Sequence, residues 1–263
     1  MNKKIVMSLA VIAAATVVMA GGTVAYFSDT EQSTGNTFTA GNIDLKIDSQ
    51  CHYNGGNCPD ANSNWALTDL DSGVHKFFNF NDIKPGSWGE NTISMHLTSN
   101  PAWAWLKINA SQNLENGCNE PELKAEPNCA ADNVGELAGK LNYIIWQDSD
   151  CSNTINAGEY IFKQPGTIAD CGVYQLNKNC STDPNCGSCN PLQPTDPAHP
   201  YCVGVAWCAG TWVADASNTT VGYRCDGGAI GNEAQGDSLN LDVQFDVVQS
   251  MNNLNAAGGP VCQ

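Results

Sequence analysis

An acidic loop carries the side chains whose types and spacing are best suited to chemistry. In the stretch WQDSDCSNTINAGEY, oxygen-bearing residues stand at positions one, three, five, seven and twelve of a twelve-residue loop: Asp148, Asp150, Ser152, Thr154 and Glu159. Hard oxygen ligands at alternate positions can wrap around a Ca²⁺ ion, and a glutamate at position twelve can close the shell with both oxygens. Position six holds Asn153 instead of glycine, but asparagine also reaches the left-handed conformation. The spacing predicts a Ca²⁺ site, and the competing interpretation is a solvated acidic turn after a strand.

The sequence contains no familiar catalytic motif. Its four histidines lack the HExxH spacing that places two imidazoles and a general base on one helix face: His52, His75, His96 and His199. A GxSxG nucleophile elbow, a P-loop and a GxGxxG after a strand are also missing. We therefore expect no enzyme, although an active site assembled from distant residues stays an alternative.

The acidic loop follows one of several predicted strands. The late run SLNLDVQFDVV alternates strictly, so that one set of side chains faces a core: Leu239, Leu241, Val243, Phe245 and Val247. Residues 43–47 and 93–97 alternate in the same way, while AWAWLKINA and LNYIIWQD are richer in aromatic residues and predict deeper burial. Turn sequences such as Lys84-Pro85-Gly86 separate the strands. This pattern predicts an all-β fold, a jelly-roll-like antiparallel sandwich.

Only one helix is expected after the amino terminus. In DNVGELAGKLNY, Val134, Leu137 and Leu141 stand at helical spacing, with Asp132 before them as a cap. The pattern predicts a short helix that crosses the sheet.

The amino terminus predicts a signal helix that directs export. Lys3 and Lys4 precede an uncharged run that extends to Ala25, and small residues end that run. This order is typical of a secretory signal peptide at residues 1–25, with cleavage before Tyr26 or, as a second choice, before Gly21. The alternative is an uncleaved anchor, because the run could just span a bilayer. Cleavage would leave a secreted or cell-surface protein with no stable membrane association.

Charge and length limit the binding partners and the domain organisation that we expect for this chain. The chain has 27 acidic against 11 basic side chains, so it would repel nucleic acids and anionic lipids. We expect residues 26–41 to be an amino-terminal segment separate from the fold, and residues 42–263 to form a single domain. From about 167 to 200 the sequence turns to dense Cys, Pro and Asn, which predicts a loop insertion held by disulfides.

Thirteen cysteines follow the leader, and in an exported protein they predict disulfides. An odd number leaves one thiol that is free or paired between subunits. Short loops favour the pairs Cys51 with Cys58 and Cys118 with Cys129. The CxxC of Cys186 and Cys189 is expected to be a structural bridge, since no βαβ pattern surrounds it, and a redox or zinc role is the alternative.

Three blocks of sequence resemble the TasA and camelysin family. The first is the leader with AYFSDTE followed by NTFTAGNIDLKID, the second is FNDIKPGSWGE at residues 80–90, and the third is NEAQGDS before the last strand. The resemblance implies a jelly-roll subunit that a SipW-like signal peptidase releases and that assembles into extracellular fibres of a biofilm matrix or into bundling pili.

The resemblance also implies how such a fibre would form. In the family's fibres the freed amino-terminal segment can enter the sheet of a neighbouring subunit, and an alternating segment such as 26–41 suits that role as a donor strand. The expected partner is therefore a second copy of the chain.

Two other functions stay open. Camelysin is described as a surface metallo-endopeptidase, but this sequence offers no matched catalytic residue. A monomeric surface binding module that uses exposed tryptophans is the third candidate.

Overall fold

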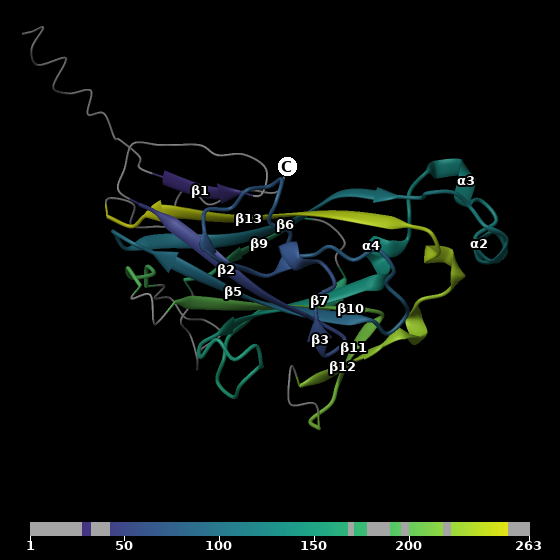
Figure 1. Cartoon of the computed structure of the whole chain (residues 1–263). Coiled ribbons are helices and arrows are strands. Elements are labelled where there is room, and N and C mark those ends of the chain that lie inside the picture. Colours follow the sequence, from purple (N-terminus) through teal and green to yellow (C-terminus); the bar gives the residue numbers. More distant parts are fainter. Residues whose placement is uncertain are drawn as a thin grey trace, which may run out of the picture.

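The computed structural model describes residues 28–32, 43–167, 171–177, 190–195, 200–217 and 222–251. The predicted signal peptide, the CxxC and His199 lie outside these ranges. The described residues form two stacked antiparallel sheets with a small third sheet beside them (Figure 1). The predicted all-β antiparallel sandwich is thus confirmed.

The smaller sheet has the strand order β1-β13-β6-β9. Its strands are β1 (Ser28–Gln32), β13 (Ser238–Gln249), β6 (Ala102–Leu114) and β9 (Gly172–Gln175). The alternation predicted for the last strand is found in β13, where Val243, Phe245 and Val247 are buried. β13 pairs with β6 along its whole length, with one irregularity between Asn240 and Leu241.

The larger sheet has the order β3-β2-β5-β10-β7-β8, and β4 also pairs with β2. These strands are β3 (Gly56–Asn57), β2 (Leu45–Tyr53), β5 (Trp88–Leu97), β10 (Tyr201–Ala209), β7 (Leu141–Asp148), β8 (Ile161–Thr167) and β4 (Trp65–Thr68). A two-stranded sheet of β11 (Thr211–Ala214) and β12 (Tyr223–Asp226) completes the fold.

The main core lies between the two large sheets. Ile93 and Met95 of β5 and Val203 of β10 pack in one cluster with Leu106 of β6 and Phe245 of β13. A second cluster covers the outer face of the larger sheet, where Trp146 is fully buried with Ile144, Ala206 and Trp212. The larger sheet is therefore buried on both faces around β7 and β10.

The predicted helix is interrupted. The chain forms two short helices, α3 (Cys129–Asp132) and α4 (Leu137–Lys140), after α2 (Glu120–Ala125). Asn133 has a left-handed backbone with φ of 59°, which ends α3 directly after Asp132. Val134 is exposed, whereas Leu137 and Leu141 are buried. Helical spacing therefore predicted the burial of Leu137 and Leu141, but it was wrong for Val134 and missed the break at Asn133.

Short 3₁₀ turns and sharp reversals connect the strands. The 3₁₀ turns are η1 (Ala61–Ser63), η2 (Gly227–Ala229) and η3 (Asn232–Ala234). The predicted turn at Lys84-Pro85-Gly86 is a tight reversal, in which the Ser87 N–H donates to the Lys84 carbonyl at 2.8 Å and Gly86 has a φ of 85°. Proline followed by a left-handed glycine is the signature of a type II turn.

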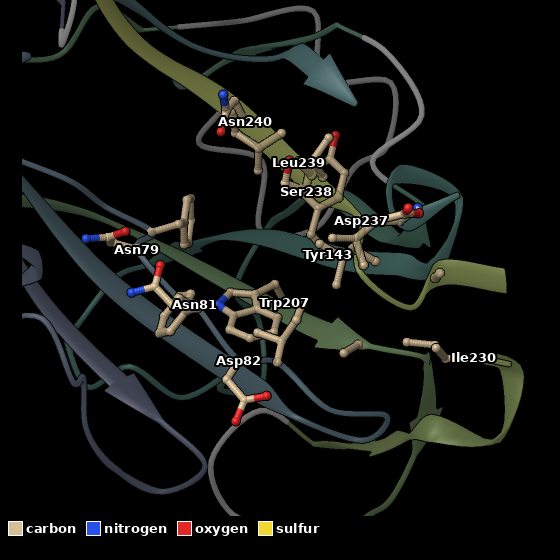
Figure 2. A pocket seen from close by; sticks show the side chains of 18 of the residues that line it. Asn79, Asn81, Asp82, Tyr143, Trp207, Ile230, Asp237, Ser238, Leu239 and Asn240 are labelled. Atoms are coloured by element: carbon tan, nitrogen blue, oxygen red, sulfur yellow. The ribbon is translucent and has the colours of Figure 1, made fainter. Parts of the chain in front are cut away.

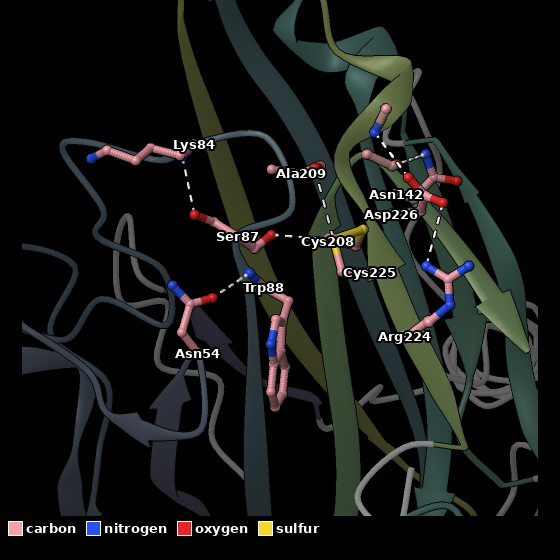
Figure 3. Close-up of a disulfide and its surroundings, with 12 residues drawn as sticks. Asn54, Lys84, Ser87, Trp88, Asn142, Cys208, Ala209, Arg224, Cys225 and Asp226 are labelled. Atoms are coloured by element: carbon pink, nitrogen blue, oxygen red, sulfur yellow. Dashed lines mark hydrogen bonds and ion pairs between the residues drawn. A yellow bond between two sulfur atoms is a disulfide. The ribbon is translucent and has the colours of Figure 1, made fainter. Parts of the chain in front are cut away.

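Disulfides connect loops to the sheets. Both predicted short-loop pairs, Cys51–Cys58 and Cys118–Cys129, are present. Cys151–Cys202 joins the loop after β7 to β10, and Cys208–Cys225 joins β10 to β12 (Figure 3). Cys171 is disulfide-bonded as well. In the described ranges we find no helix with the length and apolar character needed to span a bilayer.

Candidate functional site

The acidic loop begins at the end of β7 and is closed by its own hydrogen bonds. Asp148, the last residue of β7, is fully buried and accepts from the Ser152 N–H at 2.9 Å and the Asn153 N–H at 2.7 Å. Asn153 has a φ of 60°, which is the left-handed conformation that its place in the loop required. The Cys151–Cys202 disulfide fixes the loop against β10. The backbone therefore takes the curled path that the sequence pattern predicts.

Three of the five predicted ligands come together in this loop. One oxygen from each of Asp148, Asp150 and Glu159 lies within 4.8 Å of the other two. The hydroxyl groups of Ser152 and Thr154 lie 2.6 Å apart and bond to each other. The loop thus offers an oxygen cluster of the kind that binds hard cations.

Two residues that the sequence pattern did not single out complete the loop. The Asn156 side-chain amide donates to Asp150 Oδ2 at 3.0 Å and to Ser152 Oγ at 3.1 Å. Ser149 donates to Glu159 Oε1 through its N–H at 2.7 Å and its hydroxyl at 2.9 Å. A cation bound by these oxygens would have to displace the Asn156 amide. The turn-forming series Asn-Ala-Gly before Glu159 is the only sequence signal that points to Asn156.

Burial changes the acidity of the carboxyl groups beneath the loop. Loss of solvent raises the pKa of Asp148 to about 6, whereas hydrogen bonds from Ser152 lower the pKa of the exposed Asp150. Glu90, on β5, is also buried, and burial together with the charge of Asp148 raises its pKa to about 7. His52 Nδ1 lies 3.8 Å from Glu90 Oε1 and 3.4 Å from the Asn153 amide. The acidic loop therefore lies next to the carboxyl group of Glu90, whose pKa is close to neutral pH.

The described histidines lie apart from one another. His52 is beside Glu90, His96 Nε2 lies 3.5 Å from Asp48 Oδ2, and His75 accepts from the Asp71 N–H. In the described ranges, no histidine belongs to a group of three residues that could share a metal ion.

The edge of the smaller sheet is a second candidate site, because it holds part of the segment at residues 26–41. β1 pairs with β13 in antiparallel register, from Ser28 opposite Val248 to Gln32 opposite Gln244. Figure 1 shows β1 as the outermost strand beside β13. β13 continues past this pairing to Ser238, so β1 covers only one half of it.

A cavity lies along the other half of β13. It has a volume of about 1020 Å³ and is lined by residues 238–243, by the loop at residues 75–85 and by core side chains that include Tyr143 and Trp207. Figure 2 shows Ser238, Leu239 and Asn240 on one side and Asn79, Asn81 and Asp82 on the other. A large space thus lies next to the half of β13 that extends beyond β1.

Polar contacts hold the surface beside the Cys208–Cys225 disulfide. Asn54 Oδ1 accepts from the Trp88 N–H at 2.9 Å, and Arg224 pairs with Asp226 at 3.4 Å (Figure 3). The Asn54 contact ties the β2–β3 turn to β5 of the larger sheet, whereas the Arg224–Asp226 pair lies within β12. They give this region a structural role.

Comparison with known proteins identifies the amino-terminal part of the chain. Residues 1–58 match the model of a family described as camelysin metallo-endopeptidase. No curated protein sequence matches the chain. The matched range includes β1 and all of β2, and it coincides with the first block of the predicted resemblance. The similarity to the camelysin family is thus carried by this amino-terminal segment of the chain.

Proposed function

We propose that the chain is a secreted structural subunit that assembles into extracellular fibres by exchange of its amino-terminal strand. The observation that carries this proposal is the pairing of β1 with the edge of β13. β1 is a short edge strand that would lie close to the new amino terminus after cleavage before Tyr26, and its removal would expose the backbone groups of β13 to another strand. The same segment from a neighbouring subunit could then take its place.

The half of β13 that extends beyond β1 supports this exchange. Continuing the register of β1 would set residues 33–38 of a donor opposite residues 243–238 of β13. The cavity of about 1020 Å³ borders the same residues and gives the longer donor room. A donor of about 14 residues would then cover β13 as fully as β6 does on its other side.

The chemistry of the chain supports an extracellular location. Four described disulfides link its loops and strands, and such bonds persist in oxidising compartments. A SipW-like signal peptidase that cuts before Tyr26 would free the donor segment. Cleavage would then control when assembly starts, and the fibre would belong to a biofilm matrix or pilus-like structure.

Electron microscopy tests the proposal directly. A chain that begins at Tyr26 is expected to form filaments as its concentration rises, whereas a chain that begins at Asn42 is expected to remain monomeric. Circular dichroism of both chains confirms that the sandwich is folded. Monomers of the longer chain at every concentration would reject the proposal.

The camelysin family name keeps a metallo-endopeptidase as the second candidate. The same purified chain distinguishes the two, because a peptidase would cleave casein and lose this activity in the presence of a chelator. Filaments without chelator-sensitive cleavage would favour the structural role.

We also propose Ca²⁺ as the ligand of the acidic loop, because its three carboxylates and two hydroxyl groups provide hard oxygen ligands. Asp150→Asn is expected to remove one Ca²⁺ per chain, counted by isothermal titration after treatment with EGTA. Asp69→Asn, an exposed aspartate elsewhere, is the matched control. An unchanged count in Asp150→Asn would contradict Ca²⁺ binding by the loop.

A further inference from the structure

A second group of carboxylates lies at the end of the sandwich that carries the helices. It comprises five residues from separate parts of the chain, and we call it the carboxylate cluster: Glu115, Glu122, Glu126, Glu136 and Asp237. They follow β6, lie in or end α2, precede α4 and precede β13. Figure 1 shows α2 and α3 at this end of the molecule, with α4 nearer to the sheets.

Three members face one another closely. One oxygen from each of Glu115, Glu122 and Asp237 lies within 4.8 Å of the other two. Glu122 is 0% exposed and Glu115 is 7% exposed. Two of the three carboxyl groups are therefore shielded from water almost completely.

In each of these three carboxyl groups, one of the two oxygens accepts hydrogen bonds from backbone N–H groups. Glu115 Oε1 accepts from the Gly117 N–H at 2.9 Å, and Glu122 Oε2 accepts from the Asn119 N–H at 3.1 Å as half of a capping box. Asp237 Oδ2 accepts from the N–H groups of Glu136 and Leu137. Backbone groups thus fix the orientation of all three side chains.

The second oxygen of each carboxyl group has no protein partner. Among the described residues, no hydrogen bond reaches Glu115 Oε2, Glu122 Oε1 or Asp237 Oδ1. The side chains of Glu126 and Glu136 interact with each other. Buried polar atoms are normally hydrogen-bonded, because an unsatisfied one costs free energy. Three such oxygens on carboxyl groups that face one another indicate a ligand that the protein itself does not supply.

No side chain neutralises this charge in the part of the chain that the structure describes. Lys140, the basic residue of α4, pairs with Glu233 instead, at 2.5 Å. Burial, together with Glu126, Asp237 and Glu115, raises the pKa of Glu136 to about 7, and burial also raises the pKa of Asp237. Such a group of buried like charges is stable only with a bound cation or with bound protons.

The donor atoms indicate which cation fits. All five residues supply carboxylate oxygens, and the nearby Cys118 and Cys129 are joined in a disulfide, so they offer no thiolate. Ca²⁺ takes six to eight oxygen ligands in flexible geometry, whereas Zn²⁺ favours nitrogen and sulfur. We propose that the carboxylate cluster is a structural Ca²⁺ site, separate from the acidic loop, that joins α2 and α4 to the start of β13.

Isothermal titration and thermal unfolding with the Glu122→Gln/Asp237→Asn variant test this site. Glutamine and asparagine keep the accepting oxygens for the backbone N–H groups and preserve the capping box, but they remove two anionic ligands. The variant is expected to bind one Ca²⁺ fewer per chain than the wild type and to lose the Ca²⁺-dependent rise in Tm that this site causes. In EGTA its Tm is expected to equal or exceed that of the wild type, because repulsion is relieved.

Two controls separate this site from the acidic loop and from general charge effects. Glu120→Gln changes an exposed glutamate in the same helix and is expected to bind Ca²⁺ like the wild type. Asp150→Asn is expected to leave binding at the carboxylate cluster intact. A Ca²⁺ count and a Tm rise that stay unchanged in the Glu122→Gln/Asp237→Asn variant would overturn the proposal.

Hydrogen exchange of the wild-type chain gives a test that needs no substitution. Added Ca²⁺ is expected to slow amide exchange at Gly117, Glu122 and Leu137, whose neighbouring carboxyl groups would hold the ion. Unchanged exchange at all three amides at saturating Ca²⁺ would also overturn the proposal. Both tests use the monomer and so do not depend on fibre assembly.

Discussion

The double variant Asp29→Pro/Thr30→Pro is expected to abolish filaments while the sandwich still folds. Both residues lie in β1, opposite Val247 and Asp246 of β13. Neighbouring residues of an edge strand direct their N–H groups to opposite sides, so one of the two prolines must remove a hydrogen bond to β13. The prolines would weaken β1 as a donor in every subunit. Negative-stain microscopy and sedimentation measure the loss.

The alanine variant Asp29→Ala/Thr30→Ala is the matched control, because it removes the same side chains but keeps both N–H groups. It is expected to form filaments. A peptide of residues 26–39 gives an independent test, since an excess should occupy β13 and stop the growth of wild-type filaments. Normal filaments from the proline variant would show that β1 is not the strand that is exchanged.

Replacing Trp146 by alanine is expected to lower the free energy of unfolding by about 3–5 kcal/mol. Trp146 is fully buried on the outer face of the larger sheet, among Ile144, Ala206 and Trp212. It lies directly over Gly204 of β10, where a Cβ atom would be 2.1 Å from the ring. The substitution would thus leave a large cavity over β10. Urea denaturation with the disulfides intact measures the change.

The glycine beneath the ring supplies the controls for this prediction. Gly204→Ala is expected to cost about 1–3 kcal/mol, because its methyl group would push against Trp146. In the double variant that methyl group would fill part of the cavity, so the combined loss should be smaller than the sum of the two. Trp146→Phe should cost less than Trp146→Ala. Additive losses would contradict the close packing of Trp146 on Gly204.

The predictions from sequence were most accurate for features that depend on residues close together in the chain. The alternation of Val243, Phe245 and Val247 identified β13, because a strand directs every second side chain to the core. Asn153 was expected to replace a glycine, and it has the left-handed backbone. The short sequence separation within each pair also led to the correct disulfides, Cys51–Cys58 and Cys118–Cys129.

Features formed by residues that lie far apart in the sequence could not be predicted from local patterns. Glu90 lies near the acidic loop only because β5 and β7 both pair with β10. The carboxylate cluster joins residues from 115 to 237, and nothing in the spacing of Glu115, Glu122 and Asp237 suggests that they meet. The break at Asn133 was missed because an asparagine can either continue a helix or end it.

The pairing of β1 with its own β13 has a consequence for the driving force of polymerisation. If a donor strand replaced β1 in the same register, the hydrogen bonds in the open and closed forms would be identical. A tethered strand also competes at an effective concentration in the millimolar range, which favours the closed subunit in dilute solution. Net growth would then depend on contacts beyond those of residues 28–32, such as the contacts of a longer donor along residues 238–242 of β13. The closed subunit would act as a self-inhibited precursor, and the half of β13 beyond β1 would set the critical concentration for fibre growth.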